Sequence, residues 1–214
     1  MRAAGILLFC VFSSFLSTVT SLRCEQCVGI GSDCEETGAK EVECKEPEDY
    51  CSIIVFNSTI THPPSNIVIK ECSTRELCLD GLTSTTTVDG RFEIARGHCC
   101  QTDLCNSELL SLEDYYALKP NGLKCPGCYK LEEDDCEANQ TVNCVGEEDQ
   151  CLTLSSTTIS LAFRSKSTFH GCTAEKSCSY PVGPSLVAGG ILLYNVTRLE
   201  CRNATSPVVL SDDH

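Results

Sequence analysis

Apolar and β-branched residues gather in several short stretches of this chain, and such stretches between polar segments are typical of β-strands. In the first half, CSIIVF at 51–56 and NIVIKEC at 66–72 flank a turn that contains Pro63 and Pro64. This arrangement predicts a β-hairpin closed by a long loop. In the second half, residues that favour strands fill CLTLSS at 151–156, STFHGC at 167–172 and ILLYNVTRLEC at 191–201. We therefore expect an all-β protein built from hairpins.

A different pattern marks the N-terminus, where Arg2 precedes an apolar run at 5–15 that only Ser13 and Ser14 interrupt. Small residues follow this run. The pattern is typical of a secretory signal peptide, which we predict at 1–21 with cleavage after Ser21, or alternatively after Thr20 or Arg23. The mature protein is therefore expected in an oxidising compartment, where disulfide bonds persist.

No membrane anchor is predicted. The late apolar run at 186–194 is too short to span a bilayer and is followed by Cys201, so it predicts a strand. A glycosylphosphatidylinositol anchor needs a C-terminal apolar tail of roughly 10 to 20 residues, whereas this chain ends SPVVLSDDH. We expect a soluble, secreted, extracellular protein.

The cysteines reveal an internal repeat. Cys10 lies in the predicted signal peptide, and the other 18 of the 19 cysteines form an even set that fits a disulfide framework. Eight of them lie at 24, 27, 34, 44, 51, 72, 78 and 99, and eight more recur 100 to 102 residues later at 125, 128, 136, 144, 151, 172, 178 and 201. Only the first copy continues, with Cys100 and Cys105. The repeat predicts two copies of one module.

The two copies define the expected domain organisation. A first module covers 22–106, a linker covers 107–122, and a second module covers 123–214, lacks the last cysteine pair and ends in a flexible tail. The linker, SELLSLEDYYALKPNG, contains no cysteine and ends in turn-forming residues. Its apolar residues are compatible with a short helix or with an extended segment. Modules of this size bury little core, so disulfides must contribute much of the stability.

Charge and motifs exclude several classes of function. A net charge of −14 at pH 7 argues against nucleic acid and anionic membranes as partners, because both attract clustered lysine and arginine. We interpret the acidic runs at 132–135 and 147–149 as solvated loops. Four sequons, at Asn57, Asn139, Asn195 and Asn203, predict N-linked glycans and agree with a secretory route.

No catalytic residue, metal site or cofactor is predicted. The C-x-x-C pairs at 24–27 and 125–128 resemble redox or zinc motifs, but such a use would leave other cysteines without partners. The histidines at 62, 98, 170 and 214 share no metal-ligand spacing. We expect a structural or surface role for His98 and His170, and a protein that is not an enzyme.

LRCEQC at 22–27, the long hairpins and CCQTDLCN at 99–106 together resemble the three-finger module of the lymphocyte antigen 6 and urokinase receptor family. The resemblance covers 22–201 and implies two tandem three-finger domains, each with fingers that radiate from a disulfide-rich palm. It implies that Asn106 satisfies backbone groups of the palm, since an amide offers donors and an acceptor. The implied disulfides are Cys24–Cys51, Cys27–Cys34, Cys44–Cys72, Cys78–Cys99, Cys100–Cys105, Cys125–Cys151, Cys128–Cys136, Cys144–Cys172 and Cys178–Cys201.

Two such modules, with KPNGLKCPGC at the junction and an early stop after the last LEC, resemble the gamma-type phospholipase A2 inhibitors. This resemblance implies a soluble glycoprotein that forms homo-oligomers and that binds and inhibits secreted phospholipase A2. The chain departs from that pattern at 108–119, which contains no proline where those inhibitors carry a proline-rich segment. The alternatives are an extracellular signalling ligand of the sodefrin-precursor type and a soluble modulator of a cell-surface receptor.

The candidate partner-binding residues lie on fingers and linker. By position, we expect contacts from the middle finger at 53–69 and the third finger at 83–94 of the first module. In the linker, tyrosine is favoured at interface hot spots, and the candidates are Leu109, Tyr115, Tyr116 and Pro120. Packing between the modules is the alternative role for the two tyrosines.

Overall fold

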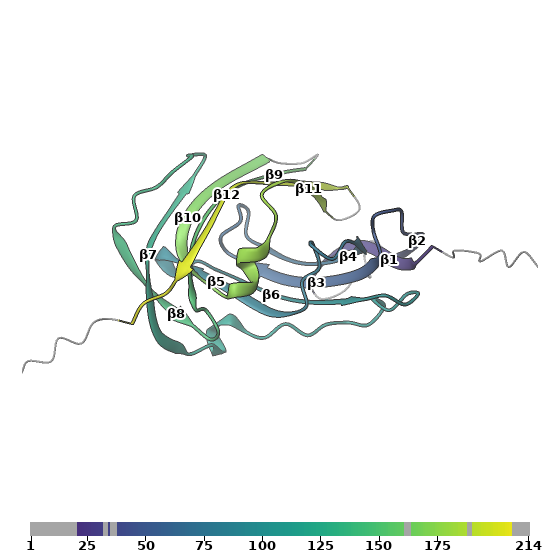
Figure 1. Ribbon diagram of the computed structural model, residues 1–214, viewed down its shortest axis with the longest axis horizontal. Helices are drawn as coiled ribbons and strands as arrows, with labels where there is room; N and C mark the ends of the chain where they lie inside the picture. The colour runs from purple at the N-terminus through teal and green to yellow at the C-terminus, as the bar shows by residue number, and fades with distance from the viewer. Residues whose placement is uncertain (1–20, 32–33, 35–37, 161–163, 188–189, 207–214) are drawn as a thin grey trace, which may run out of the picture.

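The chain folds into two modules made almost entirely of β-strands, as Figure 1 shows. The computed structural model describes residues 21–31, 34, 38–160, 164–187 and 190–206. The predicted signal peptide, except for Ser21, lies outside these residues. No helix among the described residues has the length and apolar character that crossing a membrane requires. The expectation of an all-β, disulfide-rich fold is confirmed.

The first module contains three antiparallel hairpins, which we call its first, middle and third fingers. They consist of β1 (Arg23–Ile30) with β2 (Lys40–Glu43), β3 (Tyr50–Ser58) with β4 (Ser65–Ser73), and β5 (Gly81–Thr87) with β6 (Phe92–Cys100). The short 3-10 helix η1 (Val88–Gly90) turns the chain at the tip of the third finger, where Asp89 and Gly90 adopt positive φ angles. Within the sheet, the order is β5-β6-β3-β4-β1-β2.

The second module repeats this order as β11-β12-β9-β10-β7-β8. Its strands are β7 (Pro120–Leu131), β8 (Gln140–Val145), β9 (Gln150–Ile159), β10 (Arg164–Thr173), β11 (Gly183–Val187) and β12 (Leu192–Asn203), with the 3-10 helix η3 (Glu175–Ser179) before β11. Strand β7 begins inside the expected linker. In the remaining part of that linker, the only regular element is the single 3-10 turn η2 (Tyr115–Ala117), so the structure has the extended form there.

One continuous sheet joins the two modules (Figure 1). Strand β5 of the first module pairs antiparallel with β10 of the second, matching Thr85, Thr86 and Thr87 with Thr173, Cys172 and Gly171. A Cβ atom at Gly171 would lie 2.1 Å from the carbonyl oxygen of Thr86, so this close approach of the strands requires glycine. We call this contact and the side chains around it the module joint.

Two fingertips of the first module each place one apolar side chain in the second module. Val88, at the tip of the third finger, packs in a cluster with Cys125, Val142 and other residues of the second palm. Ile60, at the tip of the middle finger, packs against Leu152 and Phe169. The apolar core therefore continues across the module joint.

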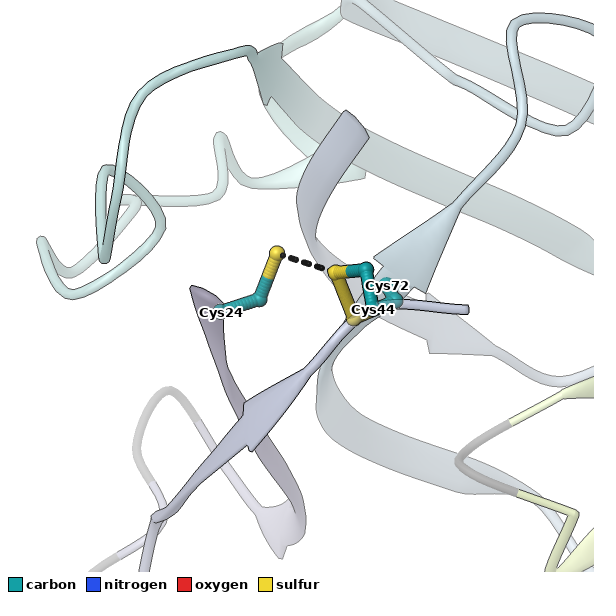
Figure 2. A group of neighbouring side chains, drawn as sticks. All are labelled: Cys24, Cys44 and Cys72. Atoms are coloured by element: carbon teal, nitrogen blue, oxygen red, sulfur yellow. Dashed lines mark hydrogen bonds between the residues drawn. A yellow bond between two sulfur atoms is a disulfide. The ribbon is translucent and has the colours of Figure 1, made fainter. Parts of the chain in front are cut away.

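Nine disulfide bonds stabilise the two modules, and each of them joins two cysteines of the same module. They join the same pairs of cysteines that the family resemblance implies. In the first palm, Figure 2 shows Cys24 beside the Cys44–Cys72 bond, with the sulfur atoms of Cys24 and Cys44 3.1 Å apart. All three sulfur atoms belong to disulfides, so this cluster offers no thiolate ligand to a metal.

Backbone hydrogen bonds hold the chain just after the last cysteine. Ala204 donates to the carbonyl of Asp149 at 2.8 Å, and Thr205 forms an isolated bridge with Lys124. This part of the expected flexible end is therefore attached to the second palm without a disulfide. Residues 207–214 lie outside the described residues.

Candidate functional site

The linker leaves the first palm from a firmly held position. Asn106 is fully buried, and its side-chain Nδ2 donates to the carbonyls of Glu25 and Ser52 while its Oδ1 accepts from the backbone N–H of Glu25, all at 2.9 Å. The buried Lys70 pairs with Glu25 at 2.7 Å and donates to the carbonyl of Ser107 at 2.8 Å. The start of the linker is thus bonded to β1, β3 and β4.

Beyond Ser107, the linker lies along one face of the first module. Leu110 and Leu112 pack against the apolar cluster that includes Ile53 and Val68. Glu113 forms an ion pair with Arg96 of β6. These contacts hold Leu110, Leu112 and Glu113 against the first module and so define the inner side of this segment.

The two adjacent tyrosines of the linker have different environments. The Tyr115 ring stacks on Phe92 with 4.0 Å between ring centroids, and its hydroxyl lies 2.6 Å from the Thr86 hydroxyl. Burial raises the pKa of the Tyr115 phenol. Tyr116 contacts the same aromatic group edge-on but remains 76% exposed. Tyr115 thus packs at the module joint, whereas Tyr116 is available to a partner.

The other two linker candidates also face outward. Leu109 is 62% exposed, and Pro120, at the start of β7, is exposed as well. We call Leu109, Tyr116 and Pro120 the outer linker surface. The middle and third fingers of the first module, which the sequence also suggested, each bury one tip residue against the second module, whereas 62–64 and 89–90 are exposed.

Acidic side chains have two distinct environments in the second module. The run at 132–135 is exposed, as predicted, and its carboxylates pair with basic residues of β7, β10 and β12, including Arg164, Lys166 and Arg198. The prediction of a solvated loop at 147–149 is wrong for Glu148, which is fully buried at the module joint. Nothing in the sequence distinguishes Glu148 from its exposed neighbours Glu147 and Asp149.

The two histidines near the palms make ordinary polar contacts. His98 is exposed and lies 3.2 Å from Asp80. His170 is half-buried, with its Nδ1 3.1 Å from the Thr153 hydroxyl, and burial lowers the pKa of its imidazole. His170 also lies near Cys128 and Cys136, but these two cysteines form a disulfide with each other. These positions fit the structural or surface role expected for both residues.

Comparisons with known proteins identify both modules. A family model described as "Phospholipase A2 inhibitor" matches residues 22–107, and one described as "u-PAR/Ly-6 domain" matches residues 121–204. Phospholipase A2 inhibitor NAI of Notechis ater is 30% identical over 177 residues, which cover 82% of this chain and 85% of that one. A gamma-type chain of the phospholipase A2 inhibitor of Elaphe quadrivirgata is 35% identical over 178 residues, covering 81% and 84%.

A solved structure is also similar to the chain. The crystal structure of mouse TEX101 covers 86% of this chain and 99% of its own, with 18% sequence identity and a TM-score of 0.33. The two snake inhibitors share both modules and reach 30% identity or more over most of their length. The chain belongs to the family of the phospholipase A2 inhibitors, built from two modules of the u-PAR/Ly-6 type.

Proposed function

We propose that this chain is a secreted glycoprotein that binds secreted phospholipase A2 and inhibits it by protein–protein contact. The observation that carries the proposal is the similarity of both modules, over 81 to 82% of the chain, to proteins named phospholipase A2 inhibitors. These relatives are named as inhibitors and not as enzymes, which supports a function by binding alone.

The outer linker surface is the contact region that the geometry favours. Leu109 and Tyr116 are large, exposed and held in place by the inner side of the linker, so they offer apolar area at little cost in conformational entropy. Exposed Glu108 and Asp114 lie beside them in the chain. An apolar surface with acidic neighbours suits a basic enzyme.

A binding and activity experiment tests the function. The purified protein is immobilised and exposed to a panel of basic and acidic secreted phospholipases A2, and hydrolysis of phospholipid is measured with and without the soluble protein. We expect capture and inhibition of at least one basic enzyme. A reduced and alkylated sample, in which the disulfides are lost, should be inactive. Absence of both binding and inhibition at micromolar concentration across the panel would contradict the proposal.

Alanine substitutions test the contact region separately. Replacing both Leu109 and Tyr116 by alanine should weaken binding about tenfold or more, since buried tyrosine anchors dominate many interfaces. The matched control is Leu186→Ala, because Leu186 is 68% exposed but lies on β11 in the second module. Equal affinity of the double variant and the control would place the contact elsewhere while leaving the inhibitory function intact.

A further inference from the structure

Glu148 connects the two modules through its carboxylate. It lies in the turn between β8 and β9 of the second module and is fully buried. Its Oε1 accepts hydrogen bonds from the hydroxyls of Ser84 at 2.9 Å and Thr86 at 2.8 Å, both on β5 of the first module. Its Oε2 accepts from the backbone N–H of Val145 at 3.0 Å. Two of these three bonds therefore cross the module joint.

No described lysine, arginine or histidine forms an ion pair with Glu148. Strands β5 and β8 contain no charged residue. From β7, the neutral amide of Asn121 donates to the backbone carbonyl of Glu148 at 2.9 Å. Lys119, before β7, and Lys176, in η3, are both exposed, and the Lys176 ammonium donates to the carbonyl of Asp80. A buried carboxylate without a cation is costly when it is ionised.

Among the described titratable side chains, the phenol of Tyr115 contacts the hydrogen-bond network of Glu148, whereas the neighbouring carboxyl groups lie outside this site. The phenol of Tyr115 reaches the Thr86 hydroxyl from the linker, and because that hydroxyl donates to Glu148, the phenol donates to Thr86. Glu147 and Asp149 flank Glu148 in its own turn and are exposed. On β6, Glu93 is opposite Thr85 in the register and so belongs to the other face of the sheet. Burial also raises the pKa of Glu93.

The surrounding hydroxyls can form hydrogen bonds with Glu148 in either of its protonation states. When the carboxylate is ionised, Ser84 and Thr86 donate to it. When it is neutral, its own O–H can donate to one of these hydroxyl oxygens, since a hydroxyl both donates and accepts. Protonation therefore removes the buried charge and reverses one of these hydrogen bonds, while the same groups can stay in contact.

We propose that the protonation state of Glu148 controls how tightly the two modules dock at the module joint. The modules dock tightly when Glu148 is neutral and more weakly when it is ionised. This effect of protonation on docking occurs in the free protein and does not depend on phospholipase binding.

The sign and the pH range follow from linkage between proton binding and docking. Burial raises the pKa of Glu148 from 4.5 to about 7 in the docked modules, and separation of the modules exposes the carboxyl group to water and returns its pKa toward 4.5. Docking is therefore strongest below pH 4.5, weakens as the pH rises from 4.5 to 7, and is constant above. Over that range, the docking equilibrium constant should fall on the order of 100-fold.

Hydrogen exchange read by mass spectrometry tests the proposal on the intact protein at pH 5 and pH 7.5, with rates corrected for the intrinsic effect of pH. Peptides covering 81–88 and 171–174 should open much more readily at pH 7.5, while peptides from β3 should not change. Glu148→Gln keeps the shape and is always neutral, since its amide oxygen can accept from the Val145 N–H while its NH2 donates to the two hydroxyl oxygens, and it should remove the pH dependence. Glu147→Gln, at an exposed neighbouring position, should behave like the unaltered protein.

Two results would overturn the proposal. One is equal protection of the joint peptides at both pH values in the unaltered protein. The other is an unchanged pH dependence in Glu148→Gln, which would point to Glu93 or another group. If Glu148→Gln is not secreted, the Glu148 carboxyl carbon is titrated by NMR in the unaltered protein. A midpoint near 7 then supports the proposal, and a midpoint near 4.5 overturns it.

Discussion

Asn106 connects the end of the first module to β1 and β3, two strands that do not pair directly with each other. Its amide uses both donors and its acceptor on β1 and β3, at a point where the chain leaves the first palm. A buried amide with every bond made stabilises the local arrangement, and its removal leaves backbone groups without partners. From these contacts we propose a structural role for Asn106 in the palm.

Replacing Asn106 by alanine should destabilise the protein by about 2–3 kcal/mol, because three backbone groups lose their partner in a buried site. We expect a lower melting temperature and a lower yield of secreted protein. The matched control is Asn66→Ala, since Asn66 is exposed on β4. An unchanged melting temperature and yield in Asn106→Ala would rule out the structural role.

At the scale of strands, the sequence predicts local structure well and contacts between modules poorly. The apolar and β-branched residues gathered at 51–56 and 151–156 predict strands that the structure contains as β3 and β9. By contrast, β5 has the sequence GLTSTTT, which does not show that its hydroxyls bond to Glu148 or that the strand pairs with β10. Such contacts depend on how the modules are placed, and no periodicity within one module encodes that placement.

The pairing of β5 with β10 depends on a residue without a side chain. Gly171→Ala should push the two strands apart, because the new Cβ would overlap the carbonyl oxygen of Thr86. We expect a cost of about 1–3 kcal/mol and a larger radius of gyration in small-angle X-ray scattering. Ser165→Ala, near the other end of β10, is the control. An unchanged radius together with unchanged stability would show that the joint tolerates the methyl group.

The sequons differ in the elements that carry them. Asn139 and Asn203 are exposed, whereas Asn57 and Asn195 are half-buried within β3 and β12. A glycan on a half-buried strand position must displace neighbouring side chains when the sheet forms. We therefore expect higher occupancy at Asn139 and Asn203, as measured by glycopeptide mass spectrometry. Full occupancy at Asn57 with little at Asn139 would contradict this expectation.

The whole molecule is strongly acidic, with a net charge of −14 at pH 7. Long-range attraction should speed the encounter with a basic phospholipase, and salt screens that attraction. We expect the association rate constant, measured by surface plasmon resonance, to fall at least several-fold between low and physiological ionic strength. The dissociation rate constant should change much less. A salt-independent association rate would exclude electrostatic steering.

The glycine of the module joint has a further consequence for assembly. The cysteine register places Glu71 of β4 in the first module where the second module has Gly171. In the first module, this position therefore carries a long acidic side chain instead of the glycine that lets β5 approach β10 closely in the second. A further copy that added to β4 by the same pairing would meet the Glu71 side chain, so the residue at this one position disfavours extension of the sheet by repeated module joints.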